Sequence, residues 1–146
     1  MTSIYEQDLD KTPANFEALS PVSFLERSAD IYPDLTAVIH GQRCYNWAQI
    51  RERSARLANA LLTAGVQRGH TVSVMLSNTP EMLEAHYAVP AVNAVLHALN
   101  TRLDAALIAW QMNHCEADVV LVDQTPIGKT PRSTPASTWA QWPRVP

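Results

Sequence analysis

The sequence of 146 residues predicts an α/β fold with a mostly parallel sheet flanked by helices. Three observations support this prediction. Short apolar runs at 71–76, 94–98 and 118–122 are typical of buried strands, segments with helical periodicity lie between them, and helix-capping or helix-breaking residues separate the two kinds. Strands that alternate with helices favour parallel pairing, because parallel neighbours need a crossover connection. Hydrophobic residues make up 47% of the chain and charged residues 17%, as expected of a globular domain.

The first helix is expected to follow Pro21. Residues 1–20 are polar and irregular, and we expect an extended lead-in there. An apolar stripe then marks a helix that Pro33 ends; its members are Phe24, Leu25, Ser28 and Ile31. Residues 35–39 resemble a short strand, and after a turn at 40–42 the segment 43–45 is predicted to return as its hairpin partner.

The clearest helix follows Asn46, which is a plausible N-cap. Gly65 is the expected C-terminal stop of this helix. Its apolar residues recur at three- and four-residue spacing, which predicts one buried face; they are Trp47, Ile50, Leu57, Ala58 and Leu61.

The second half of the chain repeats the strand–helix pattern. A buried strand at 71–76 leads to a helix whose first residue is Pro80 and which Pro90 should kink or shorten. A strand at 94–98 precedes a helix that begins after Asp104 and runs to about His114. The continuous apolar run at 118–122 is typical of a parallel strand buried on both faces.

The chain therefore divides into a lead-in at 1–20, an α/β unit at 21–123 and a tail at 124–146. The tail holds five of the ten prolines and has no hydrophobic periodicity. Such a segment buries too little apolar surface to offset the entropy lost on ordering, so we predict no regular structure there.

Composition and charge exclude several classes of protein. A formal net charge of -3 gives no electrostatic basis for binding nucleic acid. No apolar run approaches the roughly 20 residues that span a bilayer, and the acidic N-terminal segment does not resemble a secretory signal. Two cysteines do not make a disulfide framework. We therefore expect a cytoplasmic location, no membrane span and no nucleic-acid partner.

Two tempting motifs have simpler explanations. The residue types of His40, Cys44, His114 and Cys115 suit zinc, but no CxxC spacing is present and we predict no metal site. Neither cysteine has a recognisable catalytic motif, so we expect no catalytic residue. Gly128, Lys129 and Thr130 after a strand suggest a phosphate loop, but Asp123 stands where its first glycine should be. We interpret this segment as part of the polar tail.

The loop Asn100-Thr101-Arg102 is the best candidate binding site. It follows a predicted parallel strand, and α/β sheets bind ligands beyond the carboxyl ends of their strands. Arg102 could meet a phosphate group. The alternative is that Asn100 and Arg102 cap and brace the next helix.

Much of the chain resembles a known family. The most specific stretch is AVPAVNAVLHALNTRLDAALIAWQMNH, and YNWAQIRERSARLANALLTAGVQRGHTV upstream is also similar. Over about residues 20–123 the sequence resembles the N-terminal subdomain of AMP-dependent, adenylate-forming acyl-CoA synthetases, most closely the medium- or short-chain fatty-acyl group. Asn93 stands where the family usually has a glycine.

The resemblance implies a scaffold, not a complete active site. Family members form an acyl-adenylate from ATP and a carboxylic or fatty acid and then make acyl-CoA, using ATP, magnesium and coenzyme A. Their ATP loop, which ends in Pro-Lys-Gly, and their catalytic Lys come later in the chain, where this sequence runs into its tail.

The resemblance thus implies an N-terminal fragment that is inactive alone and binds no cofactor, apart from a coenzyme A contact at Asn100, Thr101 and Arg102. The alternative is a non-catalytic interaction module that binds a full-length synthetase or self-associates through exposed apolar surface.

Overall fold

The computed structural model describes residues 10–16, 19–123 and 138–141. Its elements, in chain order, are α1 (Pro21–Ile31), β1 (Thr36–His40), β2 (Arg43–Asn46), α2 (Trp47–Thr63), β3 (Thr71–Met75), α3 (Pro80–Ala91), β4 (Val95–Ala98), α4 (Ala105–His114), β5 (Ala117–Val122) and β6 (Thr138–Gln141). The α/β class is confirmed, and every helix and strand predicted between residues 21 and 123 is present, with bounds that shift by one or two residues.

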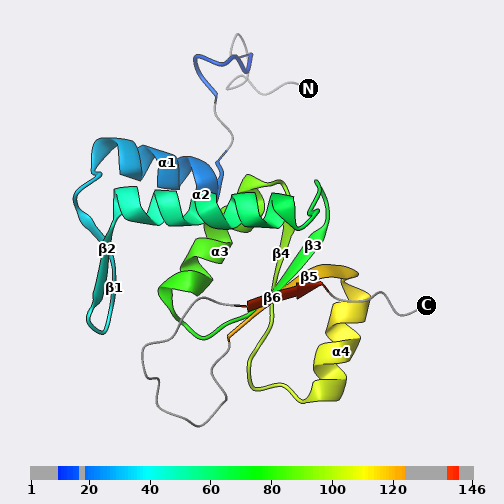
Figure 1. Cartoon of the computed structure of the whole chain (residues 1–146). Coiled ribbons are helices and arrows are strands. Elements are labelled where there is room, and N and C mark those ends of the chain that lie inside the picture. The colour runs from blue at the N-terminus through cyan, green and yellow to red at the C-terminus, as the bar shows by residue number, and fades with distance from the viewer. Residues whose placement is uncertain (1–9, 17–18, 124–137, 142–146) are drawn as a thin grey trace, which may run out of the picture.

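The main sheet is built around β3. Its strand order is β4-β3-β5-β6 (Figure 1). Strand β3 pairs in parallel with both β4 and β5, so that Val72 lies between Leu96 and Val119. The predicted parallel arrangement is therefore confirmed for three strands, and the fourth, β6, is antiparallel to β5.

The two faces of the sheet are covered unequally. The larger buried cluster joins β3 and β5 to α2 and α3, with Val72 and Val74 fully buried at its centre. On the other face a smaller cluster lies beneath α4 and includes Met112 and Val120. Side chains alternate along a strand, so the central strand β3 contributes to both faces. Helix α4 is anchored by fewer buried residues than α2 and α3 are.

Local sequence signals account for the helix boundaries. Asn46 accepts a hydrogen bond from the Gln49 amide at 2.8 Å, while the Gln49 side chain accepts one from the Asn46 amide at 2.9 Å. This capping box confirms Asn46 as the N-cap of α2. Asp104 caps α4 by accepting from the Leu107 amide at 2.9 Å. Pro90 is the penultimate residue of α3 and shortens it, as predicted.

An ion pair joins the two helices that cover the larger core. Arg53 of α2 donates to both carboxylate oxygens of Glu84 of α3, at 2.6 and 3.2 Å. The Glu84 side chain is only 7% exposed. Its burial raises the pKa of the Glu84 carboxyl, and the hydrogen bonds from Arg53 lower it; burial dominates and the net shift is upward.

The β1–β2 hairpin forms a separate two-stranded sheet, and charged side chains join it to α2 and α3. Arg43 of β2 pairs with Glu81 of α3 at 2.7 Å. The guanidinium of Arg53 lies 4.7 Å from the centre of the Tyr45 ring, within the range of a cation–π interaction. The hairpin turn contains Gly41 with φ of +61°, a conformation that favours glycine.

The prediction for the tail is wrong at one place. Residues 138–141 form strand β6, which pairs antiparallel with β5 from Val119 to Val122. An edge strand needs only backbone partners, and β5 has an edge on which to provide them, so hydrophobic periodicity is not required. The rest of the predicted disorder, at 124–137 and 142–146, lies outside the described residues.

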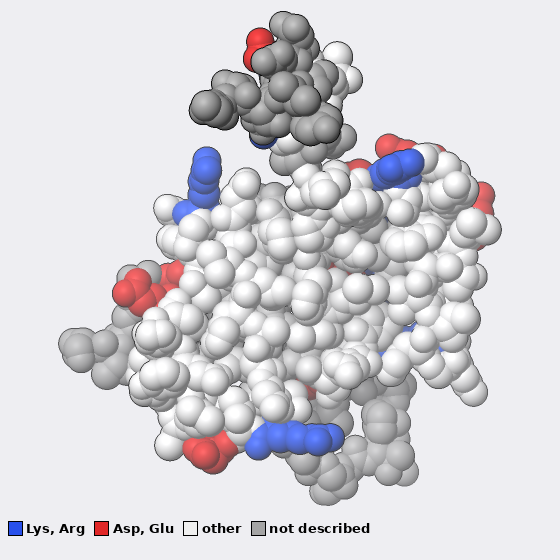
Figure 2. All heavy atoms as spheres, turned by 180° about the vertical axis from the view of Figure 1, so that it is seen from behind, with Lys and Arg blue, Asp and Glu red and all other residues white. Residues whose placement is uncertain are grey.

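Several large apolar side chains remain exposed on β4 and α4. Val95 is 53% exposed, Leu107 39% and Trp110 59%. Figure 2 shows one face of the molecule on which charged side chains are sparse and lie toward its margins. None of the helices in the described ranges is long and apolar enough to cross a membrane.

Two residues other than glycine adopt positive φ. Asn93, which ends the turn after α3, has φ of +56°, and Glu116, between α4 and β5, has φ of +51°. The left-handed conformation costs most L-residues about 1–2 kcal/mol, whereas asparagine tolerates it better. Asparagine is therefore suited to the backbone conformation at position 93.

We expect Arg53→Met to lower the free energy of unfolding by roughly 2–3 kcal/mol at pH 7, because it leaves a buried carboxylate without its partner. The folded state of the variant then binds a proton at Glu84 more tightly than the unfolded state does. Stability therefore falls as pH rises, and the loss should be smaller at pH 5. Urea unfolding at both pH values measures it.

Arg56→Met is the control, since its partner Glu52 is exposed, and it should cost under about 0.5 kcal/mol. An Arg53→Met loss that is equal at both pH values would argue against a buried charge as its cause.

We expect Glu116→Gly to raise the free energy of unfolding by about 0.5–1 kcal/mol, because glycine removes the left-handed strain at the cost of extra freedom in the unfolded chain. Ala55→Gly, on the exposed side of α2, should instead lose about 1 kcal/mol. Both are measured by urea unfolding. Destabilisation by Glu116→Gly would show that the side chain contributes more than its conformation costs.

Candidate functional site

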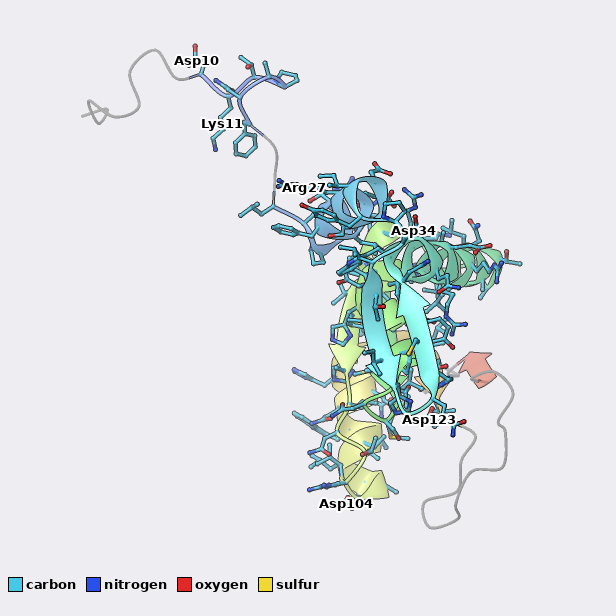
Figure 3. The ribbon with its side chains drawn as sticks, turned by 90° about the vertical axis from the view of Figure 1, so that its left-hand side faces the viewer. Asp10, Lys11, Arg27, Asp34, Asp104 and Asp123 are labelled. Atoms are coloured by element: carbon cyan, nitrogen blue, oxygen red, sulfur yellow. The ribbon has the colours of Figure 1, made fainter. Side chains whose placement is uncertain are left out.

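The carboxyl ends of the three parallel strands meet at one edge of the sheet. β3 ends at Met75, β4 at Ala98 and β5 at Val122. The chain leaves these ends through 76–79, 99–104 and Asp123, so three loops lie together where α/β sheets usually bind ligands. Figure 3 shows Asp104 and Asp123 toward one end of the molecule, away from Arg27 and Asp34.

Asp123 connects two of these loops. Its carboxylate accepts a hydrogen bond from the Ser77 amide at 2.8 Å. Ser77 immediately precedes the turn into α3, whose first turn carries Glu81. An acidic residue at this helix start opposes the binding of another anion there. This part of the edge is therefore held by its own carboxylates and offers no anion site.

The predicted binding loop is exposed and is organised by its own residues. Asn100, Thr101 and Arg102 are all exposed. Asn100 accepts a hydrogen bond from the Arg102 amide at 2.9 Å, a local turn that asparagine favours. Asp104, two residues on, caps α4. The Asn100 bond thus orders the turn before α4 and does not reach the helix itself, and Arg102 is on the surface.

The described residues enclose a pocket at the opposite, amino-terminal edge of the sheet. Its volume is about 270 Å³, and it is lined by Gly69, His70, Thr71, His114, Cys115, Glu116 and Asp118. Asp118 accepts a hydrogen bond from the Thr71 amide at 3.2 Å, and its carboxylate lies 3.6 Å from Nδ1 of His70. The lining is polar and contains two carboxylates and two imidazoles.

A cluster of nucleophilic and basic side chains lies beside this pocket, between the sheet and α4. His97 Nδ1 is 2.9 Å from Oγ of Ser73 and 3.1 Å from Sγ of Cys115. Sequence reasoning considered Cys115 beside its neighbour His114, but His114 stacks on Trp110 at 5.0 Å between ring centres. The partner of Cys115 is His97, on another strand.

The metal interpretation is not favoured by the geometry. Cys44 is exposed on the hairpin and Cys115 is half-buried beneath α4. The described part of the chain contains no group of three His, Cys, Asp or Glu residues that could hold a metal ion. Gly128, Lys129 and Thr130, the rejected phosphate-loop candidates, lie outside the described residues.

Comparison with known proteins gives one consistent family. A family model described as AMP-binding enzyme matches residues 25–141. A peroxisomal acetate/butyrate–CoA ligase of Arabidopsis thaliana is 44% identical over 117 residues, which are 80% of this chain and 21% of that protein. An acetate–CoA ligase of Humulus lupulus is 45% identical over 117 residues, with the same coverage. The chain thus spans about a fifth of the length of these relatives.

Solved structures agree with the sequence comparison. An O-succinylbenzoate coenzyme A synthetase of Bacillus subtilis, in complex with ATP and magnesium ion, matches with a TM-score of 0.67 and 26% identity, over 69% of this chain and 28% of that one. The N-terminal domain of FACL13 from Mycobacterium tuberculosis matches with a TM-score of 0.66 and 25% identity, over 67% of this chain and 25% of that one.

The match over 117 residues, the identity of more than 40% to acid–CoA ligases and the shared fold lead to one conclusion. The chain belongs to the AMP-binding enzyme family, its homologues are acyl-CoA ligases, and its fold is that of the N-terminal subdomain of adenylate-forming enzymes.

Proposed function

We propose that this chain is the N-terminal scaffold of an AMP-forming acid–CoA ligase and is inactive without the rest of such an enzyme. The observation that carries the proposal is the family match over residues 25–141 combined with coverage of about a fifth of each relative. In the complete reaction a carboxylate attacks ATP to give acyl-adenylate and pyrophosphate. The thiol of coenzyme A then displaces AMP to give acyl-CoA.

The substrate of the complete enzyme is proposed to be a short carboxylic acid. Relatives over 117 residues are named acetate/butyrate–CoA ligase, acetate–CoA ligase and 2-methylpropanoate–CoA ligase. The cytoplasmic location predicted from the sequence stays a prediction, and the peroxisomal location belongs to the Arabidopsis thaliana protein that carries it in its name.

Inactivity of the isolated chain is proposed from the groups that adenylation requires. The four glycines of the sequence are Gly41, Gly65, Gly69 and Gly128, so no glycine-rich run offers backbone amides to a triphosphate. The acidic groups of the described residues do not fit a magnesium ion. Loss of one charge-stabilising donor typically slows such reactions by about 100- to 1,000-fold, and here several are missing together.

A second candidate function is a non-catalytic interaction module whose partner is the remainder of the family's catalytic domain. It is favoured by the exposed apolar side chains Val95, Leu107 and Trp110 on β4 and α4 and by the lack of a neighbour on the outer side of β4 in the described sheet. A fragment of a larger domain exposes apolar surface where the rest would pack.

We expect no ATP–pyrophosphate exchange from the purified chain with acetate, butyrate or 2-methylpropanoate. The full-length acetate/butyrate–CoA ligase of Arabidopsis thaliana serves as the positive control. A second arm mixes this chain with that ligase lacking its matched 117 residues. Restored exchange supports both proposals, and failure to restore it counts against the interaction module. Exchange from the chain alone, lost on mild heating, would falsify the proposed inactivity.

The loop Asn100, Thr101 and Arg102 is proposed to contact coenzyme A through a phosphate at Arg102. Support comes from its place beyond β4 and the exposed guanidinium. Arg102→Ala should weaken coenzyme A binding about tenfold, because a hydrogen bond to a charged group contributes roughly 1.5–3 kcal/mol. Equilibrium dialysis measures it.

Arg68→Ala is the matched control for this measurement, since Arg68 is exposed in the loop before β3, at the other edge of the sheet. It should leave the binding within twofold. Equal weakening by the two variants, or no binding by the unmodified chain, would remove the loop as a coenzyme A contact.

A further inference from the structure

We propose that Cys115 is a nucleophilic thiol, with His97 as its base, that reacts with small uncharged electrophiles entering through the pocket at the amino-terminal edge of the sheet. The proposal does not depend on the ligase function. It begins from three distances: Sγ of Cys115 lies 3.1 Å from Nδ1 of His97 and 3.8 Å from Oγ of Ser73, and that oxygen lies 2.9 Å from the same nitrogen.

The fold places these three side chains together. Ser73 and His97 are paired residues on the parallel strands β3 and β4, so both side chains lie on one face of the sheet. That face is the one that α4 covers, and Cys115 is the C-cap of α4. The sulfur therefore lies next to β3 and β4 at the point where α4 ends. Ser73 is fully buried and fixes the ring nitrogen from the strand side.

The thiol is accessible from one direction. Cys115 is half-buried, and it lines the pocket of about 270 Å³ together with residues at the amino ends of β3 and β5. The volume accommodates a small organic molecule of a few heavy atoms, whereas drug-sized ligands use larger pockets. Cys115 is therefore in contact with the pocket, and His97, 3.1 Å from its sulfur, is not among the lining residues.

A base lies beside the sulfur of Cys115. The sulfur is 3.5 Å from the Met112 carbonyl oxygen at the carboxyl end of α4. Glu116 lines the same pocket. Reactivity needs removal of the proton as the bond forms, and Nδ1 of His97 is within hydrogen-bonding reach of the sulfur.

The reaction with an iodoalkyl amide illustrates the step. Sγ attacks the carbon that carries iodine and forms a C–S bond. The C–I bond breaks, and iodide leaves with the electron pair. The thiol proton passes to Nδ1 of His97, which requires the tautomer in which that nitrogen is the acceptor. No oxidant or reductant takes part, and the product is a thioether.

The charge of the pocket predicts selectivity between reagents. Glu116 lines the pocket and repels an anion, whereas it leaves a neutral molecule unaffected. His70 and His114 also line the pocket, and Nδ1 of His70 lies 3.6 Å from the Asp118 carboxylate. Cys44 is a built-in reference, because it is exposed on the hairpin and does not line the pocket. Iodoacetamide and iodoacetate differ in charge and hardly in size, so they are matched probes.

The test measures the alkylation rates of Cys115 and Cys44 by mass spectrometry in the 146-residue chain near pH 7.5. Cys115 should react with iodoacetamide at least about threefold faster than Cys44 does. The ratio of its rate with iodoacetamide to its rate with iodoacetate should be several-fold greater than the same ratio for Cys44. His97→Gln should slow Cys115 about tenfold or more, since general bases commonly contribute 100- to 10,000-fold. His86→Gln is the matched control, since His86 is exposed on α3 and does not line the pocket, and it should leave the rate within twofold.

The change in the alkylation rate of Cys115 in the His97→Gln variant shows whether His97 acts as a base or only covers the sulfur. If His97 only covered the sulfur, its replacement would expose Cys115 and raise the rate, and that result would overturn the proposal. Slower reaction of Cys115 than of Cys44 in the unmodified chain would do the same. The comparison of the two cysteines uses no variant. It therefore tests the proposal even if circular dichroism shows that the His97→Gln variant is unfolded.

Discussion

The described fold depends on one buried carboxylate. Glu84 lies on α3 where that helix faces α2, and it is deprived of water by the same apolar contacts that form the larger core. A carboxylate in such a place is tolerated only with a partner, and Arg53 provides it. The Arg53 guanidinium also lies over the ring of Tyr45, and Glu81, close to Glu84 on α3, pairs with Arg43. The hairpin is therefore positioned by contacts with the same group of charged side chains that neutralises Glu84. The pair specifies how α2, α3 and the hairpin are arranged more than it adds to stability.

The sheet separates two chemically different edges. At the carboxyl edge, carboxylates and asparagines hold the loops in place through backbone amides, as Asp123 does for Ser77 and Asn100 does for Arg102. At the amino edge, a polar pocket opens beside a histidine, a serine and a cysteine. The curated relatives that this chain matches are about five times as long as the matched segment. The amino-edge cluster is built from β3, β4 and α4 alone.

Local signals in the sequence were enough to predict the helices and strands. They were not enough to predict which side chains from distant segments come into contact. Asn46 and Asp104 cap helices through bonds to near neighbours. Gly65 adopts the positive φ that follows a helix end, and Pro90 lacks the N–H that a continuing helix needs. Such effects can be read from adjacent residues. The exposed loop at Asn100 was also found, because it follows a strand. The pairing of Cys115 with His97 depends on the register of β3 against β4, which periodicity does not determine. Strand β6 was missed because backbone pairing at an edge leaves little trace in composition.

The antiparallel direction of β6 limits how the sheet can grow. On its inner side β5 has a parallel neighbour, and on its outer side its hydrogen-bonding groups are already shared with residues 138–141. A further strand can join β5 only by strand exchange, in which each new backbone bond forms as an old one breaks. The competition is between a short local segment, which has a high effective concentration, and an external strand that must arrive by diffusion. Addition of a strand beyond β4 requires no such displacement within the described sheet. A further strand should therefore add more rapidly at the β4 side of the sheet than at the β5 side.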